Sequence, residues 1–203
     1  MAALRTFIAI DVPPAVLDTI TRIQNRFKSL GLHASWVKPG NIHLTLKFLG
    51  DTDPDRIPGI QNKLTETLAP FAPFRLSLSS AGVFPNTKSP RVLWVGLKDE
   101  EGTLETLQTV IEKTLESVGF PMDQRSFSPH LTLARIKSPW GIKSPKGIKS
   151  PKGKKELKDE LDAANQEGIA PHPFDVGEIK LYESQLTPKG SIYTVLANFK
   201  LNP

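Results

Sequence analysis

The sequence predicts a mixed fold of strands and helices, arranged as two related lobes. The tetrapeptide His-Leu-Thr-Leu occurs twice, at residues 43–46 and 130–133. Each copy follows the same series: an arginine that opens a strand, a helix, and a glycine that ends the helix. The arginines, Arg5 and Arg91, lie 38 and 39 residues before the histidine of their own copy. Such a repeat indicates two similar units, which we expect to pack about a pseudo-twofold axis.

Length and composition predict an ordinary globular chain. Of its 203 residues, 38% are hydrophobic and 23% are charged. There is no cysteine, so disulfides, thiolate metal sites and cysteine nucleophiles are excluded. The apolar run in MAALRTFIAIDVPP is too short for a signal peptide, and no stretch approaches a membrane span. We therefore expect one bilobed domain over residues 1–203, cytoplasmic and without a membrane partner, and we treat it as a monomer.

The first unit opens with LRTFIAI at residues 4–10, an apolar segment that predicts a buried strand. Pro13 and Pro14 come next, and proline favours the first turn of a helix. Apolar residues then recur every three or four positions, which predicts an amphipathic helix that Gly31 ends. The other elements expected in this unit are strands at 35–38 and 42–49 and a helix that opens at Asp53-Pro54.

The second unit repeats this order. Residues 91–97, RVLWVGL, predict a strand, and apolar residues at helical spacing continue from it until Gly119. Residues 130–136 carry the second motif and predict another strand. The remaining expected elements are a half-buried strand at 74–80, a helix at 155–167, and a hairpin of EIKLYES and SIYTVLANFK around Pro188-Lys189-Gly190.

The net charge of +5 is concentrated in one segment. Residues 137–158 contain eight lysines and one glutamate, a local charge of +7, so the rest of the chain sums to −2. Ile-Lys-Ser-Pro recurs there every six residues, and proline at that spacing forbids a continuous helix or central strand. We therefore interpret residues 137–154 as a lysine-rich loop inserted in the domain. Two roles stay open for it, a solvated loop expanded by sequence slippage and a tether for RNA phosphates.

The two motifs predict a shared surface. Alternate side chains of a strand point to the same face, so His43 and Thr45 share one face while the leucines between them point into a core. The same alternation pairs His130 with Thr132. If the units pack about a pseudo-twofold axis, both pairs line one cleft.

This set of side chains suits the chemistry of a phosphodiester. One protonated and one neutral histidine can deliver a proton on one side of a reacting centre and remove one on the other. Two threonine hydroxyls can hold anionic oxygens between them. Because a phosphodiester carries a single negative charge, an imidazolium and two hydroxyls can balance it without a metal ion.

The histidines have two alternative roles, structural and metal-binding. An isolated His-x-Thr on a strand is usually structural, but its recurrence within a larger repeat argues against that role here. Catalytic zinc typically needs three protein ligands. The remaining histidines, His33 and His172, fall in predicted loops and are interpreted as surface residues. We therefore expect no metal site.

Several segments together resemble a known family. They are the two His-Leu-Thr-Leu copies, RTFIAI, FPNTKSPRVLWVGL, GFPMDQRSFSPHLTLAR and LYESQLTPKGSIYTVL. In this order they resemble the RNA 2′,3′-cyclic phosphodiesterases, also called 2′-5′ RNA ligases, of the two-histidine phosphoesterase superfamily. The similarity covers residues 4–200. The chain departs from the family at the Ile-Lys-Ser-Pro repeat, where the family has a shorter, variable connection.

The resemblance implies a bilobed α+β fold, with two antiparallel sheets lining a central cleft and helices outside. It implies hydrolysis of a 2′,3′-cyclic phosphate at an RNA end, with tRNA-like fragments as candidate substrates, to leave a 2′-phosphate without a cofactor. On the family's pattern, His43 protonates the leaving 3′ oxygen, His130 activates water, and Thr45 and Thr132 hold the phosphate oxygens. From the sequence alone the two histidine roles could be exchanged. The resemblance also implies 2′-5′ ligation, in which an RNA 5′ hydroxyl replaces water.

Residues just after the motifs are expected to bind substrate. Arg135 is carried over from the family's pattern, because arginine pairs bidentately with phosphate. Phe48, at the same position after the first histidine, can stack on a base. Strict alternation puts both on the core side, so a β-bulge is needed to expose them, and a core role for Phe48 or a salt bridge for Arg135 stays open. Alternation puts Lys47 on the face of His43, where it would add positive potential. Two further candidates for aromatic walls are Phe7 and Tyr193.

Other functions remain open at this point. A non-catalytic RNA-binding module would use the cleft and the lysine-rich loop, and would bind RNA with steep salt dependence and no product. A phosphodiesterase for small cyclic nucleotides would use the same histidines. The lysine-rich loop disfavours this last function, because a small ligand does not need so long a basic segment.

Overall fold

The computed structural model describes residues 2–137, 151–169, 172–188 and 190–202. The strands are β1 (Leu4–Asp11), β2 (Ala34–Trp36), β3 (His43–Thr52), β4 (Phe74–Phe84), β5 (Val92–Asp99), β6 (His130–Ile136), β7 (Phe174–Val176), β8 (Glu178–Thr187) and β9 (Gly190–Lys200). The helices are α1 (Pro14–Lys28), α2 (Ile57–Leu68), α3 (Thr103–Glu116) and α4 (Pro151–Gln166), with 3₁₀ turns η1 (Pro39–Asn41) and η2 (Pro54–Arg56). Every helix and strand expected from the sequence is present.

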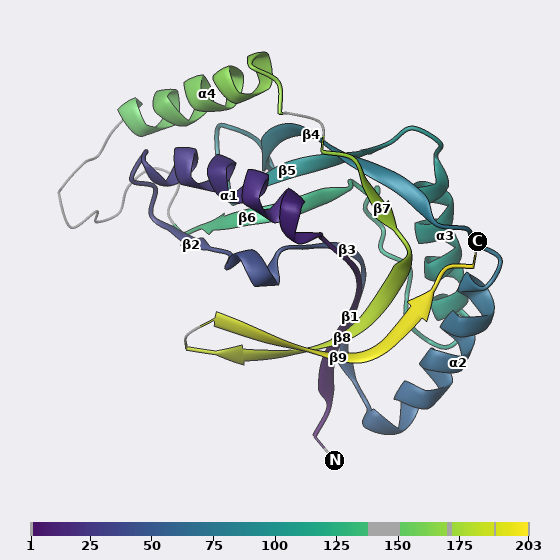
Figure 1. Ribbon diagram of the computed structural model, residues 1–203. Coiled ribbons are helices and arrows are strands. Elements are labelled where there is room, and N and C mark those ends of the chain that lie inside the picture. Colours follow the sequence, from purple (N-terminus) through teal and green to yellow (C-terminus); the bar gives the residue numbers. More distant parts are fainter. Residues whose placement is uncertain (1, 138–150, 170–171, 189, 203) are drawn as a thin grey trace.

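The strands of the described residues form one nine-stranded sheet in the order β7-β4-β5-β6-β3-β1-β8-β9, with β2 added to β6. Their pairs are antiparallel. The two motif strands meet at the centre, where Leu44 of β3 pairs with Leu131 of β6. Outward from this join, the halves β3-β1-β8-β9 and β6-β5-β4-β7 have the same plan. The predicted α+β fold is confirmed, and the two antiparallel sheets that were expected are the halves of one continuous, curved sheet (Figure 1).

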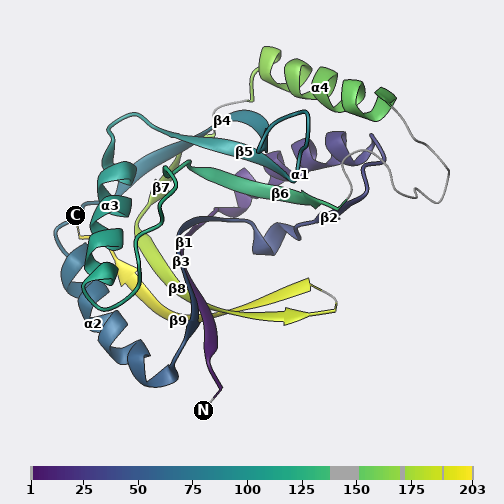
Figure 2. The same ribbon diagram turned by 180° about the vertical axis from the view of Figure 1, so that it is seen from behind.

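Each half-sheet is covered by a helix that comes from the other half. Helix α1 follows β1 but lies over β6 and β2, and α3 follows β5 but packs on β3. Helix α4 lies beside α1, joined to it by ion pairs from Arg26 to Glu160 and Glu167. At the other end of the molecule α2 packs beside α3 (Figure 2). This exchange of helices gives the two units one continuous apolar core.

A glutamine on each exchanged helix contacts the motif strand beneath it. On α1, the Gln24 Nε2 donates to the main-chain oxygens of Leu133 at 3.0 Å and Val37 at 2.8 Å. On α3, the Gln108 Nε2 donates to the main-chain oxygen of Leu46 at 3.5 Å. Leu46 and Leu133 each lie three residues after their motif histidine. The two contacts are therefore equivalent in the internal repeat.

We expect Gln24→Leu to lower the free energy of unfolding by about 1–3 kcal/mol, because the Val37 and Leu133 main-chain oxygens both lose the amide donor, although the Leu133 oxygen still accepts from the Val37 nitrogen. Gln24 is 0% exposed, so water cannot simply replace its amide. Urea denaturation measures the loss. Gln185→Leu, on the exposed part of β8, is the control. Equal losses for the two variants would contradict a specific role for the buried amide.

The start of one helix and one short strand differ from the sequence prediction, and β3 and β4 extend past their expected ends at residues 49 and 80. Helix α4 begins at Pro151, before the expected start at residue 155, because proline is tolerated in the first turn of a helix. The interpretation of residues 137–154 as a loop is therefore wrong for its last four residues, while residues 138–150 lie outside the described part of the chain. Strand β7 was not expected, since three residues are too few to show alternation.

Candidate active site

Both motif histidines are held in the same way. The His43 Nδ1 is 2.9 Å from the main-chain oxygen of Asn41, and the His130 Nδ1 is 2.7 Å from that of Ser128. A carbonyl oxygen only accepts, so each Nδ1 carries a proton and donates it to this bond. The Nε2 atom of each ring is left to exchange a proton with a ligand. Each strand thus presents one imidazole in a defined tautomer and orientation.

The alternation predicted within each motif is confirmed. Leu44 and Leu131 are buried in the core, whereas His43, Thr45, His130 and Thr132 are partly exposed on the opposite face. In the part of the chain that the structure describes, neither threonine hydroxyl is engaged in a hydrogen bond. Both hydroxyls are therefore available to donate to a bound anion.

A β-bulge comes after the threonine in each motif strand. In β3, Thr45 pairs with Ala9 and Lys47 with Ile8, so Leu46 is the extra residue. In β6, the register shift between Leu93 and Trp94 leaves Leu133 as the extra residue. One extra residue reverses which face the next side chains occupy. Strict alternation does not include a bulge, so it assigns the residues that follow each bulge to the wrong face.

The bulges expose the two residues expected to bind substrate. Phe48 is 59% exposed, and its ring centroid lies 6.1 Å from that of Phe7 on the histidine face. Arg135 is also exposed, and it makes no ion pair among the described residues. Its positive charge lowers the pKa of both His43 and His130, which places it near both rings. Phe48 is therefore not a core residue, and Arg135 forms no salt bridge within the part of the chain that the structure describes.

The same bulge sends Lys47 the other way, so its expected place beside His43 is wrong. The Lys47 ammonium and the Glu112 carboxylate form a buried ion pair, their side chains 3% and 5% exposed. Lys47 also donates to the main-chain oxygen of Pro121 at 2.8 Å, and Glu112 accepts from the main-chain nitrogen of Asp123 at 3.2 Å. Lys47 therefore fixes α3 and the segment after it to β3.

Aromatic rings surround each histidine. Phe7 stacks on His43 with centroids 4.8 Å apart, and Tyr193 meets the His43 ring edge-on at 5.2 Å. Phe7 and Tyr193 are thus walls of the site, although Phe7 is itself buried. On the other half Phe84 meets His130 edge-on at 5.0 Å, and Trp94 lies 6.4 Å from it. Sequence reasoning missed these two rings, because nothing local shows that β4 and β5 lie beside the second motif strand.

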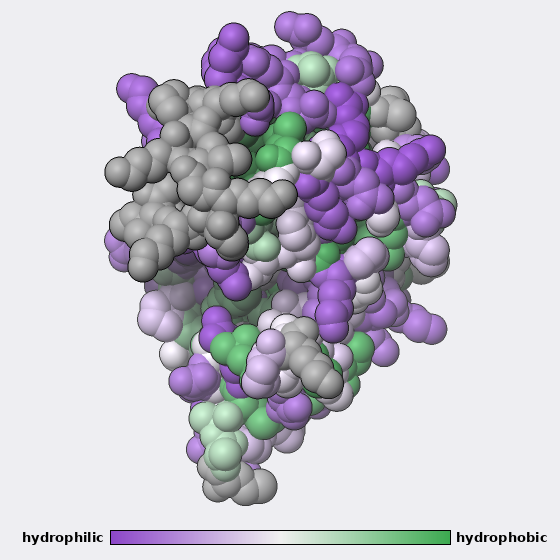
Figure 3. Space-filling model, turned by 90° about the vertical axis from the view of Figure 1, so that its left-hand side faces the viewer, coloured by the Kyte–Doolittle hydropathy of each residue, from purple (hydrophilic) through white to green (hydrophobic). Residues whose placement is uncertain are grey.

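The hairpin of β8 and β9 adds apolar surface beside the first histidine. The Asn41 Nδ2 donates to the main-chain oxygen of Ser191 at 2.8 Å, which joins the hairpin to the turn before the first motif. The hairpin projects toward the viewer in Figure 3, and hydrophobic surface is visible around it. Leu186 and Val195 are exposed on the face of Tyr193, whereas the exposed Ile192 lies on the opposite face of the hairpin. This surface lies on the same hairpin as Tyr193 and is accessible to a flat ligand such as a base.

Burial controls the protonation of both histidines. The pKa of His43 is lowered to about 4, mainly by burial and to a smaller extent by Arg135, against the hydrogen bond to Asn41 and the charge of Asp11. Burial also lowers the pKa of His130, opposed by its bond to Ser128 and reinforced by Arg135. Both imidazoles are therefore neutral near neutral pH in the free protein. A bound anion favours the charged form and will raise both pKa values.

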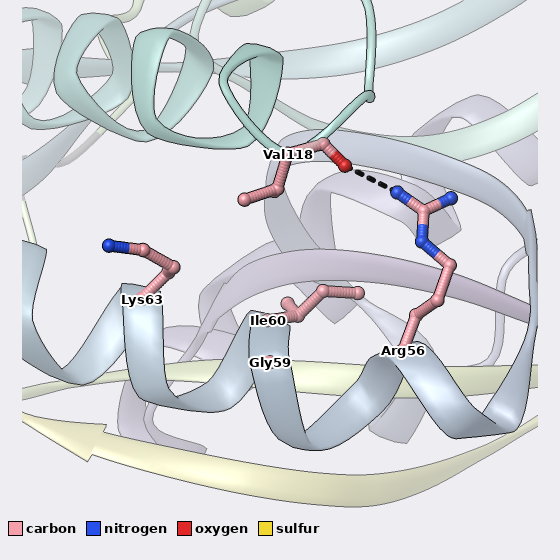
Figure 4. Close-up of a pocket in the computed structure, with 5 residues that line it drawn as sticks. All are labelled: Arg56, Gly59, Ile60, Lys63 and Val118. Atoms are coloured by element: carbon pink, nitrogen blue, oxygen red, sulfur yellow. Dashed lines mark hydrogen bonds between the residues drawn. The ribbon is translucent and has the colours of Figure 1, made fainter.

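The other two histidines and the pocket between α2 and α3 contribute nothing to this site. His33 is exposed, and His172 is partly exposed. Among the described residues no group of three or more His, Asp or Glu side chains is arranged to hold a metal ion, and no helix is long and apolar enough to cross a membrane. A separate pocket of about 270 Å³ lies between α2 and the end of α3 (Figure 4), lined by Arg56, Gly59, Ile60, Lys63 and Val118. It contains no motif residue and is formed outside the sheet.

The internal repeat also appears when the chain is compared with known proteins. The family description LigT like Phosphoesterase matches residues 10–94 and again residues 95–193, so each match contains one His-x-Thr strand. The chain is 34% identical over 198 residues to the RNA 2′,3′-cyclic phosphodiesterase of Methanothermobacter thermautotrophicus, across 98% of this chain and 99% of that relative. It is also 34% identical over 198 residues to the protein of the same name from Archaeoglobus fulgidus, across 97% and 100%.

Solved structures share the fold. The protein TT0787 of Thermus thermophilus has a TM-score of 0.76 and 26% identity over 97% of both chains. Escherichia coli LigT complexed with 3′-AMP has a TM-score of 0.74 and 23% identity over 99% of both chains. A curved sheet with one His-x-Thr strand in each half defines a two-histidine phosphoesterase. The chain belongs to the LigT-like phosphoesterase family.

Proposed function

We propose that this protein hydrolyses RNA 2′,3′-cyclic phosphate ends to 2′-phosphomonoesters by acid–base catalysis, without a cofactor. The observation that carries the proposal is the pair of histidines on one face, each with its Nε2 left for a ligand. Two threonine hydroxyls and an arginine without a partner among the described residues lie with them. The relatives named RNA 2′,3′-cyclic phosphodiesterase support the substrate class. We further propose a cytoplasmic monomer that acts on RNA ends such as those of tRNA-like fragments.

In the proposed reaction each residue of the site has one role. Water attacks phosphorus and gives its proton to the Nε2 of His130, while the bond from phosphorus to the 3′ oxygen breaks and that oxygen takes a proton from the Nε2 of His43. Thr45 and Thr132 donate to the non-bridging oxygens, and Arg135 balances their charge. An RNA 5′ hydroxyl in place of water would give a 2′-5′ bond by the same steps. This assignment of acid and base follows the family resemblance.

The product isomer tests the proposal. The protein is incubated in excess EDTA with a short RNA that ends in a 2′,3′-cyclic phosphate, and the product is identified by chromatography against 2′- and 3′-phosphate standards. We expect only the 2′-phosphate. A 3′-phosphate product would still show cyclic phosphodiesterase activity, but it would mean that the bond to the 2′ oxygen, and not the bond to the 3′ oxygen, breaks. Bound RNA without any product would instead favour an RNA-binding module, and a steep loss of affinity with salt would then be measured.

The pH dependence of kcat/KM should be bell-shaped and centred on the acidic side of neutrality. This parameter reports the free enzyme. One histidine must be protonated and the other neutral, and burial lowers the pKa of His43 to about 4 and that of His130 below its ordinary value. The kcat profile should lie at higher pH, because the bound phosphate stabilises imidazolium. Initial rates across pH test this, and a kcat/KM that rises to an alkaline plateau would contradict the paired mechanism.

A further inference from the structure

The two halves differ at one position directly beside the histidines. In the strand pairing, the residue opposite His43 is Asp11 in β1, and the residue opposite His130 is Gly96 in β5. The neighbouring pairs differ as well, with Ala9 opposite the first threonine and Trp94 opposite the second. Because the motifs themselves are near copies, the residues opposite them can give the two histidines different proton-transfer roles.

The Asp11 carboxylate is held in place by two donors from β8. The Tyr182 hydroxyl donates to Oδ1 at 2.6 Å, and the Lys180 ammonium lies 2.8 Å from Oδ2. Tyr182 is itself stacked on Phe7 at 5.2 Å, and Phe7 is stacked on His43. The carboxylate is thus fixed near His43 with 46% of its side chain exposed. Its negative charge favours the imidazolium form of His43.

A carboxylate at the equivalent position of the second half would require its neighbours to move. A Cβ added at Gly96 would lie 2.7 Å from the Ser79 hydroxyl oxygen and 3.4 Å from the Trp94 ring. The indole lies over Gly82 as well, where a Cβ would lie 2.3 Å from it. Aromatic rings lie beside both histidines, but the strand neighbour of His43 is an acid and that of His130 is a glycine.

The charged groups that act on His43 come from three strands. Asp11 in β1 favours its protonation and Arg135 in β6 opposes it, while Lys180 in β8 is paired with Asp11 and with Glu178. The titratable aromatic groups beside it are Tyr182 and Tyr193. A bound phosphate would place its own negative charge against Arg135 and so weaken the effect of Arg135 on His43, while burial would still lower the pKa of His43. His130 lies near Arg135, and no carboxylate among the described residues raises its pKa in the same way.

Burial lowers the pKa of His43 more strongly than that of His130, so His43 needs a favourable charge beside it to take up a proton. We propose that Asp11 is a positioning residue that supplies this charge, so that His43 can carry the proton to the leaving oxygen. Tyr182 and Lys180 hold the carboxylate for this purpose, and the glycine at position 96 leaves His130 to act as the base. The inference rests on the proposed hydrolysis and adds to it the reason that two near-identical motifs take different roles.

The test measures histidine titration and turnover separately. The imidazole Cε1–H resonances of the four histidines are followed by NMR across pH in the wild type and in Asp11→Asn, with and without inorganic phosphate. Asp162→Asn, which removes an exposed carboxylate on α4, is the charge-matched control. Tyr182→Phe keeps the Asp11 charge but removes one of its anchors, and far-UV circular dichroism checks that each variant is folded.

We expect Asp11→Asn to lower the pKa of His43 in both conditions and to leave that of His130 unchanged. The kcat for a cyclic-phosphate RNA should fall roughly tenfold for each pKa unit lost, with KM unchanged. Tyr182→Phe should shift His43 in the same direction by a smaller amount, and Asp162→Asn should do neither. An unchanged His43 pKa, or an equal shift at His130, would overturn the inference. The titration does not depend on turnover. If the wild type did not hydrolyse the RNA, the proposed function would be contradicted, while the titration would still show whether Asp11 acts on His43.

Discussion

Alanine at either motif histidine is expected to slow hydrolysis of an RNA 2′,3′-cyclic phosphate by about 10²–10⁴-fold, the usual contribution of one general acid or base. In each histidine only Nε2 can exchange a proton with the substrate, because Nδ1 donates to a main-chain oxygen. Single-turnover rates at saturating enzyme separate this loss from weaker binding. His33→Ala, at an exposed position, is the control and should retain full activity. Near-wild-type turnover in either His43→Ala or His130→Ala would contradict the paired mechanism.

A substrate that carries sulfur in place of the bridging 3′ oxygen separates the two roles. A thiolate leaves without being protonated, so most of the loss in His43→Ala should disappear with this substrate. The loss in His130→Ala should remain, because water must still be activated. Recovery of His130→Ala instead would mean that the two roles are exchanged. Recovery of neither would show that protonation of the leaving group does not limit the rate.

Lys47→Met is expected to lower the free energy of unfolding by about 3–5 kcal/mol. The substitution leaves the Glu112 carboxylate charged and buried with its cationic partner removed, although it still accepts from Asp123 and Gln108. Burying an unpaired charge costs far more than the pair contributes. Urea denaturation monitored by circular dichroism measures the difference.

Two controls separate this effect from ordinary loss of a surface charge. Lys63→Met breaks an exposed pair with Glu66 on α2 and should cost about 1 kcal/mol or less. The double variant Lys47→Met/Glu112→Leu removes both charges and should recover most of the stability lost by the single change. If the double variant were as unstable as Lys47→Met alone, lost packing and not an unpaired carboxylate would explain the result.

The organisation of the protein was predictable from local sequence alone. Apolar residues at helical spacing predicted α1 and α3, and three residues after each helix comes a glycine with positive φ, Gly31 at +67° and Gly119 at +87°. Alternation within His-Leu-Thr-Leu placed both histidines and both threonines on one face. These features depend on the period of a single element, which a short stretch of sequence specifies.

The tertiary structure decided which face the residues after each motif occupy. A bulge depends on register against the neighbouring strand, and here the main-chain oxygens of Leu46 and Leu133 bond to glutamines on helices from the opposite half. No local pattern contains that information. Lys47 was therefore assigned to the wrong face, and Arg135 could not be placed from alternation.

The position of Asp11 beside the first histidine was likewise decided by the tertiary structure. Asp11 ends a strand far from the motif in sequence, and only the pairing of β1 with β3 brings it opposite His43. The sequence by itself determined which groups the proposed chemistry uses, because that choice depends on residue type and strand period. The tertiary structure determined how the two near-identical motifs differ, because that depends on which residue of a neighbouring strand each histidine faces.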